Sequence, residues 1–401
     1  MIELDFLPSL PIAPHELLVA GLVLLAGIAS GELVLRVLRL PRITGYVLAG
    51  VLLGPGATGL LDREMLDGAH LLLDVALGLI LFELGSRLDF GWLRRNPWLL
   101  ATSAAESGLC FVLVFAVLYG LGLTSGYAAI GAGIAMGTAP AVLLLVVYEE
   151  RADGTLTDQA LNLTALNSAF AVIIVTMLLA HLHLEHEANW FVVLTHPFYL
   201  LIGSLWLGIV GSALTLLAAR WLGKREELQF MLLAGMILLT VGCALVLKLS
   251  LVVALLTLGV VVRNRDRRHN LVPVRFGSTA QILYVVLFVL TGANLELHAV
   301  LAVGWVGLGY AAARTLGKML GILLFAPLTG LSMRKGGLLG LALTPMSTVA
   351  LVLVQFTGSA YPEESAQLGA IVLSAVLLFE LTGPLAAQVA LRLSGDARAQ
   401  S

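Results

Sequence analysis

The sequence predicts an all-α integral membrane protein with 13 transmembrane helices. Of its 401 residues, 59% are hydrophobic and only 12% are charged, a balance that no soluble globular domain of this size shows. The apolar runs are about 20 residues long, which suits helices that cross a bilayer and is too long for barrel strands. The net charge of −2 gives no basic surface for a nucleic-acid partner.

Hydropathy and the placing of Gly, Pro and charged residues set the limits of the predicted spans. They are expected at residues 16–38, 43–60, 70–88, 97–120, 125–149, 158–182, 197–220, 227–247, 249–263, 276–294, 299–328, 335–357 and 364–392. With the N-terminus outside, 19 of the 23 Lys and Arg residues fall in cytoplasmic connections and only Arg63 and Lys248 in outer ones. This asymmetry predicts a multi-pass protein of the plasma (inner) membrane with an outer N-terminus and a cytoplasmic C-terminus.

Two pairs of similar segments share one spacing along the chain. Thr138 and Thr344 are 206 positions apart, and so are the pairs Leu81–Phe82 and Leu287–Phe288. Seven spans separate the members of each pair, and an odd number of spans reverses the direction in which a segment crosses the membrane. The sequence therefore predicts inverted repeats, which are typical of secondary transporters.

Each half of the chain also contains an apolar span that a proline interrupts, at Pro140 and at Pro345. Proline removes a backbone donor, and polar backbone groups freed at membrane depth survive only where they line a cavity or meet protein partners. Hydroxyl groups lie beside the two breaks, at Thr138, Thr344, Ser347 and Thr348. We therefore predict a substrate site at the breaks, which includes Ala139; the alternative is that the prolines only shape helix packing.

Two cations lie inside a predicted span. Arg314 and Lys318 are four residues apart on the helix at 299–328 and so share one face. A cation in hydrocarbon is a functional hypothesis by default, although structural pairing or snorkelling would also explain it. Among the acids that lie within spans, Glu106 and Glu380 each interrupt an apolar stretch, and both are candidate proton carriers.

Several segments resemble one family of transporters. Residues 39–55 (RLPRITGYVLAGVLLGP) resemble the opening motif of Kef- and Nap-type monovalent cation:proton antiporters. Residues 81–90 (LFELGSRLDF) and 316–321 (LGKMLG) resemble later segments of the same family in the same order. The resemblance covers about residues 17–392. It implies a sodium/proton antiporter-like fold in which two discontinuous helices cross beside the ion site.

The resemblance also implies how the chain is organised. A single transmembrane domain, residues 1–401, would hold core helices at 97–182 and 299–392 and dimerisation or scaffold helices at 16–60 and 197–263. The implied assembly is a homodimer surrounded by membrane lipids, whose core moves as an elevator. No cofactor, metal or soluble regulatory domain is expected, and the chain is expected to be a transporter and not an enzyme.

The chain departs from the family where ions should bind. The family usually has Thr-Asp-Pro at the first break, but here the residues are Thr138-Ala139-Pro140. It usually has two acids, or Asn-Asp, on the next span, where this chain has Asn167-Ser168. The resemblance makes these positions and Lys318 the expected ion site, yet serine does not ionise at physiological pH.

Three functions follow as alternatives. The first is exchange of Na⁺ or K⁺ for protons through a relocated acid, Glu106 or Glu380. The second is transport of an anion or small organic solute at a site formed by Lys318 and the broken helices. The third is a membrane subunit or sensor that keeps the fold without transporting, and the fold alone does not decide among the three.

Overall fold

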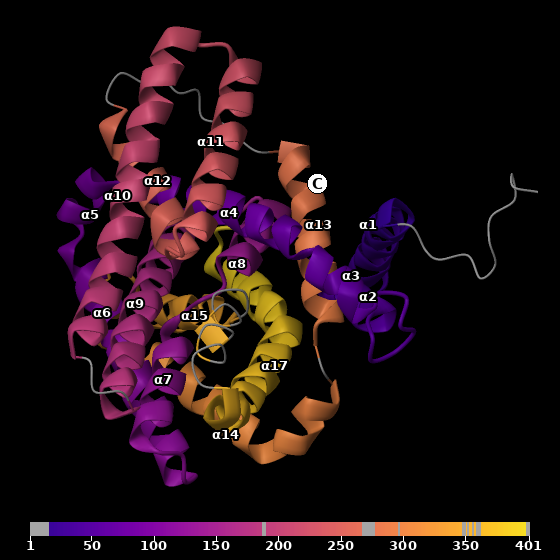
Figure 1. Cartoon of the computed structure of the whole chain (residues 1–401), viewed down its shortest axis with the longest axis vertical. Coiled ribbons are helices and arrows are strands. Elements are labelled where there is room, and N and C mark those ends of the chain that lie inside the picture. The colour runs from indigo at the N-terminus through magenta and orange to yellow at the C-terminus, as the bar shows by residue number, and fades with distance from the viewer. Residues whose placement is uncertain are drawn as a thin grey trace, which may run out of the picture. The chain divides into compact units, whose positions relative to one another are not determined.

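The computed structural model describes residues 16–186, 190–266, 277–295, 297–346, 350, 353–354, 357 and 362–397. In these ranges the chain forms helices joined by short connections and contains no β-strand (Figure 1). The predicted all-α class is confirmed. The chain divides into two compact units, Met1–Leu73 with Val285–Leu295, and Asp74–Tyr284 with Glu296–Ser401. Every residue of the candidate site described below belongs to the second unit.

The helices divide between the two units. The first unit contains α1 (Glu16–Leu33) with a π-helical turn, η1 (Val34–Leu38), then α2 (Arg42–Leu53), α3 (Arg63–Gly68) and the later part of α13 (Gly277–Ala293). The second contains α4 (His70–Arg87, from Asp74), α5 (Phe90–Arg95), α6 (Pro97–Gly120), α7 (Ser125–Met136), α8 (Pro140–Glu149), α9 (Thr155–His186), α10 (Trp190–Leu222), α11 (Glu226–Val246), α12 (Leu251–Arg265), α14 (Leu297–Phe325), η2 (Ala326–Thr329), α15 (Met333–Ala342) and α17 (Pro362–Ser394).

The helices agree with a multi-pass membrane protein. Each predicted span overlaps a helix, and nine helical segments in the described residues are long and apolar enough to cross a bilayer. Two further apolar helices, Arg42–Leu53 and Gln281–Ala293, are shorter. The number of thirteen crossings therefore stays a prediction, while the multi-pass character is confirmed.

The two predicted breaks are present and touch each other. The first separates α7 from α8, and Pro140 is the first residue of α8, where a missing N–H costs no helical bond. The second follows α15, after which residues 343–346 are not helical. The backbone N–H of Ala139 donates to the carbonyl oxygen of Pro345 at 3.0 Å, which joins the two breaks. The predicted Ser347 and Thr348 lie outside the described residues.

Close helix packing repeats in the two halves of the sequence. In the second unit, α4 and α12 meet at Gly85 and Gly259, each facing a backbone carbonyl of the other helix. In the first unit, α13 and α2 meet in the same way at Gly292 and Gly50. Since α4 and α13 carry the similar LF segments, this reciprocal packing supports the inverted repeat.

Contacts near the ends of the predicted spans agree with the side of the membrane on which each end is predicted to lie. The Asn264 amide donates to the Leu88 carbonyl oxygen at 2.8 Å, and both residues are predicted on the cytoplasmic side. The Tyr199 hydroxyl donates to the Leu247 carbonyl oxygen at 2.7 Å, and both are predicted on the outer side. Which of these two sides faces the cytoplasm stays a prediction.

The glycine packing gives a first testable prediction. Gly259→Ala would push a methyl group into the Phe82 carbonyl, and overpacking of this kind costs about 1–3 kcal/mol. We expect a lower melting temperature of the purified protein in detergent. Gly242→Ala on α11 is the matched control, because its added methyl group meets nothing within 4 Å. Equal melting temperatures for the two variants would contradict the packing described.

Candidate ion-binding site

The site is positioned by close contact between α6 and α14. Gly317 and Gly321 lie one turn apart on α14 and face the α6 backbone, where a Cβ on Gly317 would come within 2.5 Å of the Cys110 Cα. Small residues at this spacing let helices in membranes approach closely. Lys318 follows Gly317 directly, so this packing brings its side chain to Glu106 on α6.

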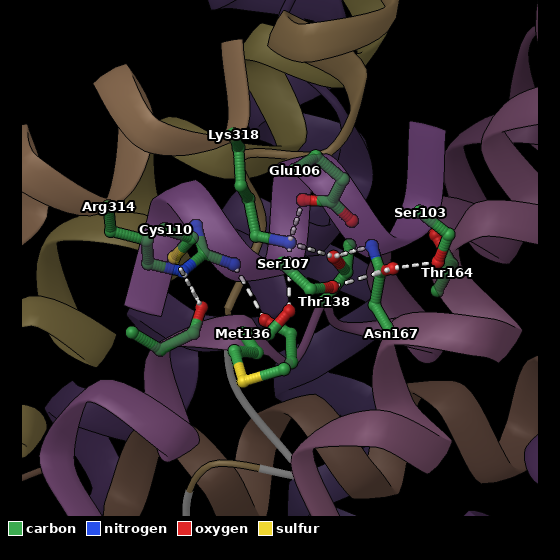
Figure 2. Close-up of polar contacts among 12 residues, drawn as sticks. Ser103, Glu106, Ser107, Cys110, Met136, Thr138, Thr164, Asn167, Arg314 and Lys318 are labelled. Carbon is green, nitrogen blue, oxygen red and sulfur yellow. Dashed lines mark hydrogen bonds and ion pairs between the residues drawn. The ribbon is translucent and has the colours of Figure 1, made fainter. Parts of the chain in front are cut away.

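Lys318 is buried, with 1% of its surface exposed, and its ammonium group donates to three oxygens. These are Glu106 Oε2 at 3.0 Å, the Met136 carbonyl at 2.8 Å and Thr138 Oγ1 at 3.1 Å (Figure 2). An ammonium group has three donors, so all of them are used. Lys318 therefore links the α6 carboxylate to the carboxyl end of α7 and to the first break.

Glu106 is fully buried, with no exposed surface. Its Oε2 accepts from Lys318, whereas its Oε1 has no hydrogen bond of ordinary geometry among the described residues. The Asn167 side chain lies close enough to interact with this carboxylate. A buried carboxylate beside an ammonium group can accept a proton or a cation, which is the property that an exchange site needs.

Arg314 satisfies the carbonyl groups that the breaks leave free. Its guanidinium group is fully buried and lies 4.8 Å from the centre of the Phe379 ring. It donates to the carbonyl oxygens of Ala135 (3.0 Å), Gly137 (2.7 Å), Thr344 (2.6 Å) and Pro345 (3.2 Å). The first two belong to the end of α7 and the last two to the end of α15. One side chain therefore caps both half-helices.

The charges in this site nearly balance. The carboxyl ends of α7 and α15 each carry a partial charge of roughly −0.5. Together with the Glu106 carboxylate they offset most of the positive charge of Arg314, Lys318 and the amino end of α8 at Pro140. This balance explains how two cations can be buried at membrane depth, where an unpaired one would be costly.

A network of neutral polar groups lies beside Glu106. Asn167 Oδ1 accepts from the hydroxyls of Ser103 (3.0 Å) and Ser107 (3.4 Å), and its amide lies 3.5 Å from Thr138 Oγ1. The Ser168 hydroxyl lies 2.8 Å from the Thr164 carbonyl and 3.3 Å from that of Thr138. The positions predicted for acids therefore hold groups that bind by hydrogen bonds alone.

The sequence analysis missed the serines of α6. Ser103 and Ser107 are three residues before and one residue after Glu106, and Cys110 follows one turn later. All four lie on one helical face, and the structure turns this face toward α9 and α14. This helical spacing around a buried acid was the available signal.

The other predicted residues have different places. Ala139, Pro140 and Pro345 form the touching breaks, and Thr344 contributes its carbonyl, since its hydroxyl bonds to Leu341. Glu380 is buried on α17, directly after Phe379. Of the two candidate proton carriers, Glu106 is the one bonded to Lys318.

Comparison with known proteins places the chain in a family. Residues 21–391 match the family model described as sodium/hydrogen exchanger, transmembrane. The chain belongs to this family. The resemblance predicted from the motifs is thereby confirmed for most of the exchanger's length, and the chain is a membrane transporter by family.

Two curated relatives are similar to this exchanger. The glutathione-regulated potassium-efflux system protein of Haemophilus influenzae is 26% identical over 377 residues, which are 89% of this chain and 58% of that protein. The chain therefore spans less than two thirds of that relative's length. The iron transporter MagA of Paramagnetospirillum magneticum is 28% identical over 140 residues, which are 34% of this chain and 32% of that protein.

Solved structures confirm the fold of the exchanger. The sodium proton antiporter MjNhaP1 from Methanocaldococcus jannaschii, in a structure at pH 8, superposes with a TM-score of 0.67 at 20% identity over 95% of this chain and 100% of that one. An electron-microscopy map of the same antiporter gives a TM-score of 0.72 at 18% identity over 95% and 98%. The predicted sodium/proton antiporter-like fold is therefore confirmed.

The buried ion pair predicts non-additive stability. Lys318→Ala would leave the Glu106 charge without its partner, and breaking a buried pair in this way costs about 3–5 kcal/mol. We expect a clear fall in melting temperature for Lys318→Ala and for Glu106→Gln alone. Glu106→Gln combined with Lys318→Ala should lower the melting temperature by less than the sum of the two single losses, because no unpaired charge is left. Strictly additive losses would show that the pair is not coupled.

The contacts of Arg314 predict that another positively charged side chain cannot replace it. Arg314→Lys keeps the charge but cannot reach four carbonyls, and each hydrogen bond to a charged group contributes about 1.5–3 kcal/mol. We expect a marked loss of melting temperature in detergent. Arg220→Lys, at an exposed position on α10, is the control and should change little. A melting temperature for Arg314→Lys equal to that of the control would show that Arg314 does not hold the breaks together.

Proposed function

We propose that this exchanger is a secondary active transporter that moves a monovalent cation, Na⁺ or K⁺, in exchange for protons, and that Glu106 is the ligand shared by cation and proton. The observation that carries this proposal is the fully buried Glu106 carboxylate, whose Oε2 lies 3.0 Å from Lys318 Nζ beside the first break. Membership of the sodium/hydrogen exchanger family supports cation and proton exchange. The name of the potassium-efflux relative supports K⁺ as one of the two cations to test.

The chemistry of exchange selects Glu106. A carrier that binds either a cation or a proton needs an anion that titrates, and neither Ala139 nor Ser168 can supply one. Glu106 is the described carboxylate that pairs with Lys318, whose ammonium group also bonds to Thr138 at the first break. A cation bound to Glu106 would replace the Lys318 ammonium group among three oxygens, from a carboxylate, a carbonyl and a hydroxyl. Oxygen ligands of this kind suit hard cations.

The contacts of Arg314 and Lys318 give less support to transport of an anionic solute. All three donors of Lys318 and the donors of Arg314 that face the breaks already bond to oxygens of the protein. An anion at this site would have to displace the Glu106 carboxylate from Lys318. A cation would instead displace the Lys318 ammonium group from Glu106, and the buried carboxylate would keep a positive partner.

The wider mechanism follows the family resemblance. We place the moving core at residues 97–182 and 299–392 and the scaffold at 16–60 and 197–263, in a homodimer that works by an elevator movement. The observation that supports this division is that α6, α7, α9, α14, α15 and α17, which form the site, all lie in the two core ranges. An inner-membrane location with the N-terminus outside follows from the distribution of Lys and Arg.

Exchange in liposomes tests the proposal. Protein reconstituted with a pH-sensitive dye should dissipate a proton gradient when Na⁺ or K⁺ is added, with Li⁺ as a further cation. We expect Glu106→Gln to reduce the rate to that of empty liposomes, because the amide cannot titrate. Glu106→Asp should retain partial activity.

Glu380→Gln is the matched control, since it neutralises a second buried glutamate of the same unit and should leave exchange in place. Loss of exchange in Glu380→Gln with activity retained in Glu106→Gln would move the proton carrier to Glu380. Failure of every cation to dissipate the gradient in the wild type would reject cation exchange and favour the other solute or the non-transporting alternative.

A further inference from the structure

The connection between α8 and α9 lies between two helices that border the ion site. It consists of residues 150–154 and joins the helix that starts at the first break to the helix that carries Asn167. Arg151 in this connection has a positive φ of 48°, which is uncommon for a residue other than glycine and marks a tight turn. A shift of this connection would therefore move α8 and α9 relative to each other.

Glu150 ties the connection to α17. It is buried, with 3% of its surface exposed, and its two oxygens accept from Arg392 Nε and Nη2, both at 2.7 Å. Gln388 donates a third bond to the same carboxylate, at 2.8 Å. Two-pronged bonds from arginine to a carboxylate are among the strongest hydrogen bonds in proteins and fix geometry as well as distance.

Asp396 makes a second attachment, just after the end of α17. Its Oδ2 accepts from the Thr157 N–H at 2.9 Å and from the Thr157 hydroxyl at 3.1 Å. Its backbone carbonyl accepts from the Asp153 N–H at 2.9 Å. This carboxylate lies at the amino end of α9, where negative charge is favourable. Any side chain at Gly154 would collide with it, so the loop and the chain end are fitted to each other.

α17 also reaches the ion site, at residues nearer its amino end. Gly383 of α17 packs against Pro345 at the second break, and Phe379 lies under the Arg314 guanidinium. Residues 379 and 392 are about 20 Å apart along the helix, at the usual rise per residue. α17 is one continuous helix with Pro384 inside it, and it touches the second break at one level and the connection between α8 and α9 at the other.

We propose that the carboxyl end of α17 is a positioning clamp for the ion site, in which Arg392, Glu150 and Asp396 fix α8 and α9 and so set where Thr138 and Asn167 lie beside Glu106. This proposal rests on the proposed function for its effect on cations, but not for its effect on the mobility of the break. Releasing the clamp loosens α8 and α9 and leaves the α6–α14 contact, with Glu106 and Lys318, in place.

Hydrogen–deuterium exchange of the full-length protein tests the clamp without relying on transport. Arg392→Gln should speed amide exchange in the connection at 150–157 and also in residues 137–142 and 164–168, which border the site. Arg263→Gln is the matched control, because Arg263 pairs with Asp89 at 3.5 Å on an exposed surface of the same unit. The Trp92 N–H holds the pKa of Asp89 below its usual range, so losing Arg263 leaves this carboxylate charged. We expect no change at the site in this variant.

A second readout separates positioning from stability. In the liposome assay, Arg392→Gln should raise the apparent KM for the cation by roughly 2- to 30-fold, the range typical of coupling at a distance. Glu150→Gln and Asp396→Asn, made separately, give the same test if Arg392→Gln does not fold. Faster amide exchange confined to residues 150–157, or a lower melting temperature with an unchanged KM, would overturn the clamp. A wild type that exchanges no cation would reject the proposed function, and amide exchange at the break would still decide the clamp.

Discussion

The exchanger depends on how it satisfies backbone carbonyls at membrane depth. Two helices stop inside the apolar layer, and each stop leaves carbonyl groups that water cannot reach. Arg314 satisfies carbonyl groups at both stops, because it donates hydrogen bonds to four carbonyl oxygens at the ends of α7 and α15. A planar guanidinium group with five donors can do this, whereas a lysine cannot. This contact joins the ends of the two broken helices, one turn before the buried Lys318 on α14.

The position of the acid follows from the same charges. Arg314 does not bond to the Met136 carbonyl at the end of α7, and Lys318 donates to that carbonyl instead. That second cation needs an anion, and the close approach of α14 to α6 puts Glu106 within reach. By the resemblance, Ala139 and Ser168 stand where acids are expected on the broken helix and on α9, and the carboxylate beside Lys318 belongs to α6 instead.

Much of this was predictable from the sequence, and the rest was not for physical reasons. Apolar length and proline fixed the helices and the breaks, and the spacing of Arg314 and Lys318 placed both on one face. The choice between Glu106 and Glu380 depends on which face of α6 meets α14, which two glycines set through packing. Arg314 bonds to backbone carbonyl oxygens and not to an acidic side chain. The types of the side chains along the sequence do not show where such carbonyls lie. Ser347 and Thr348 remain predictions, outside the described part of the second break.

The glycine contact between α6 and α14 distinguishes fast side-chain rotation at the site from slower movements of whole helices. At Gly317 and Gly321 no side chain separates the helices that carry the carboxylate and the ammonium group, so their backbones pack directly against each other. Lys318 can leave Glu106 only by rotation about its own side-chain bonds, a small and fast event compared with movements of whole domains, which take microseconds to milliseconds. Under the proposed function, loading of Glu106 would therefore need only a rotation of the Lys318 side chain, with α6 and α14 still in contact.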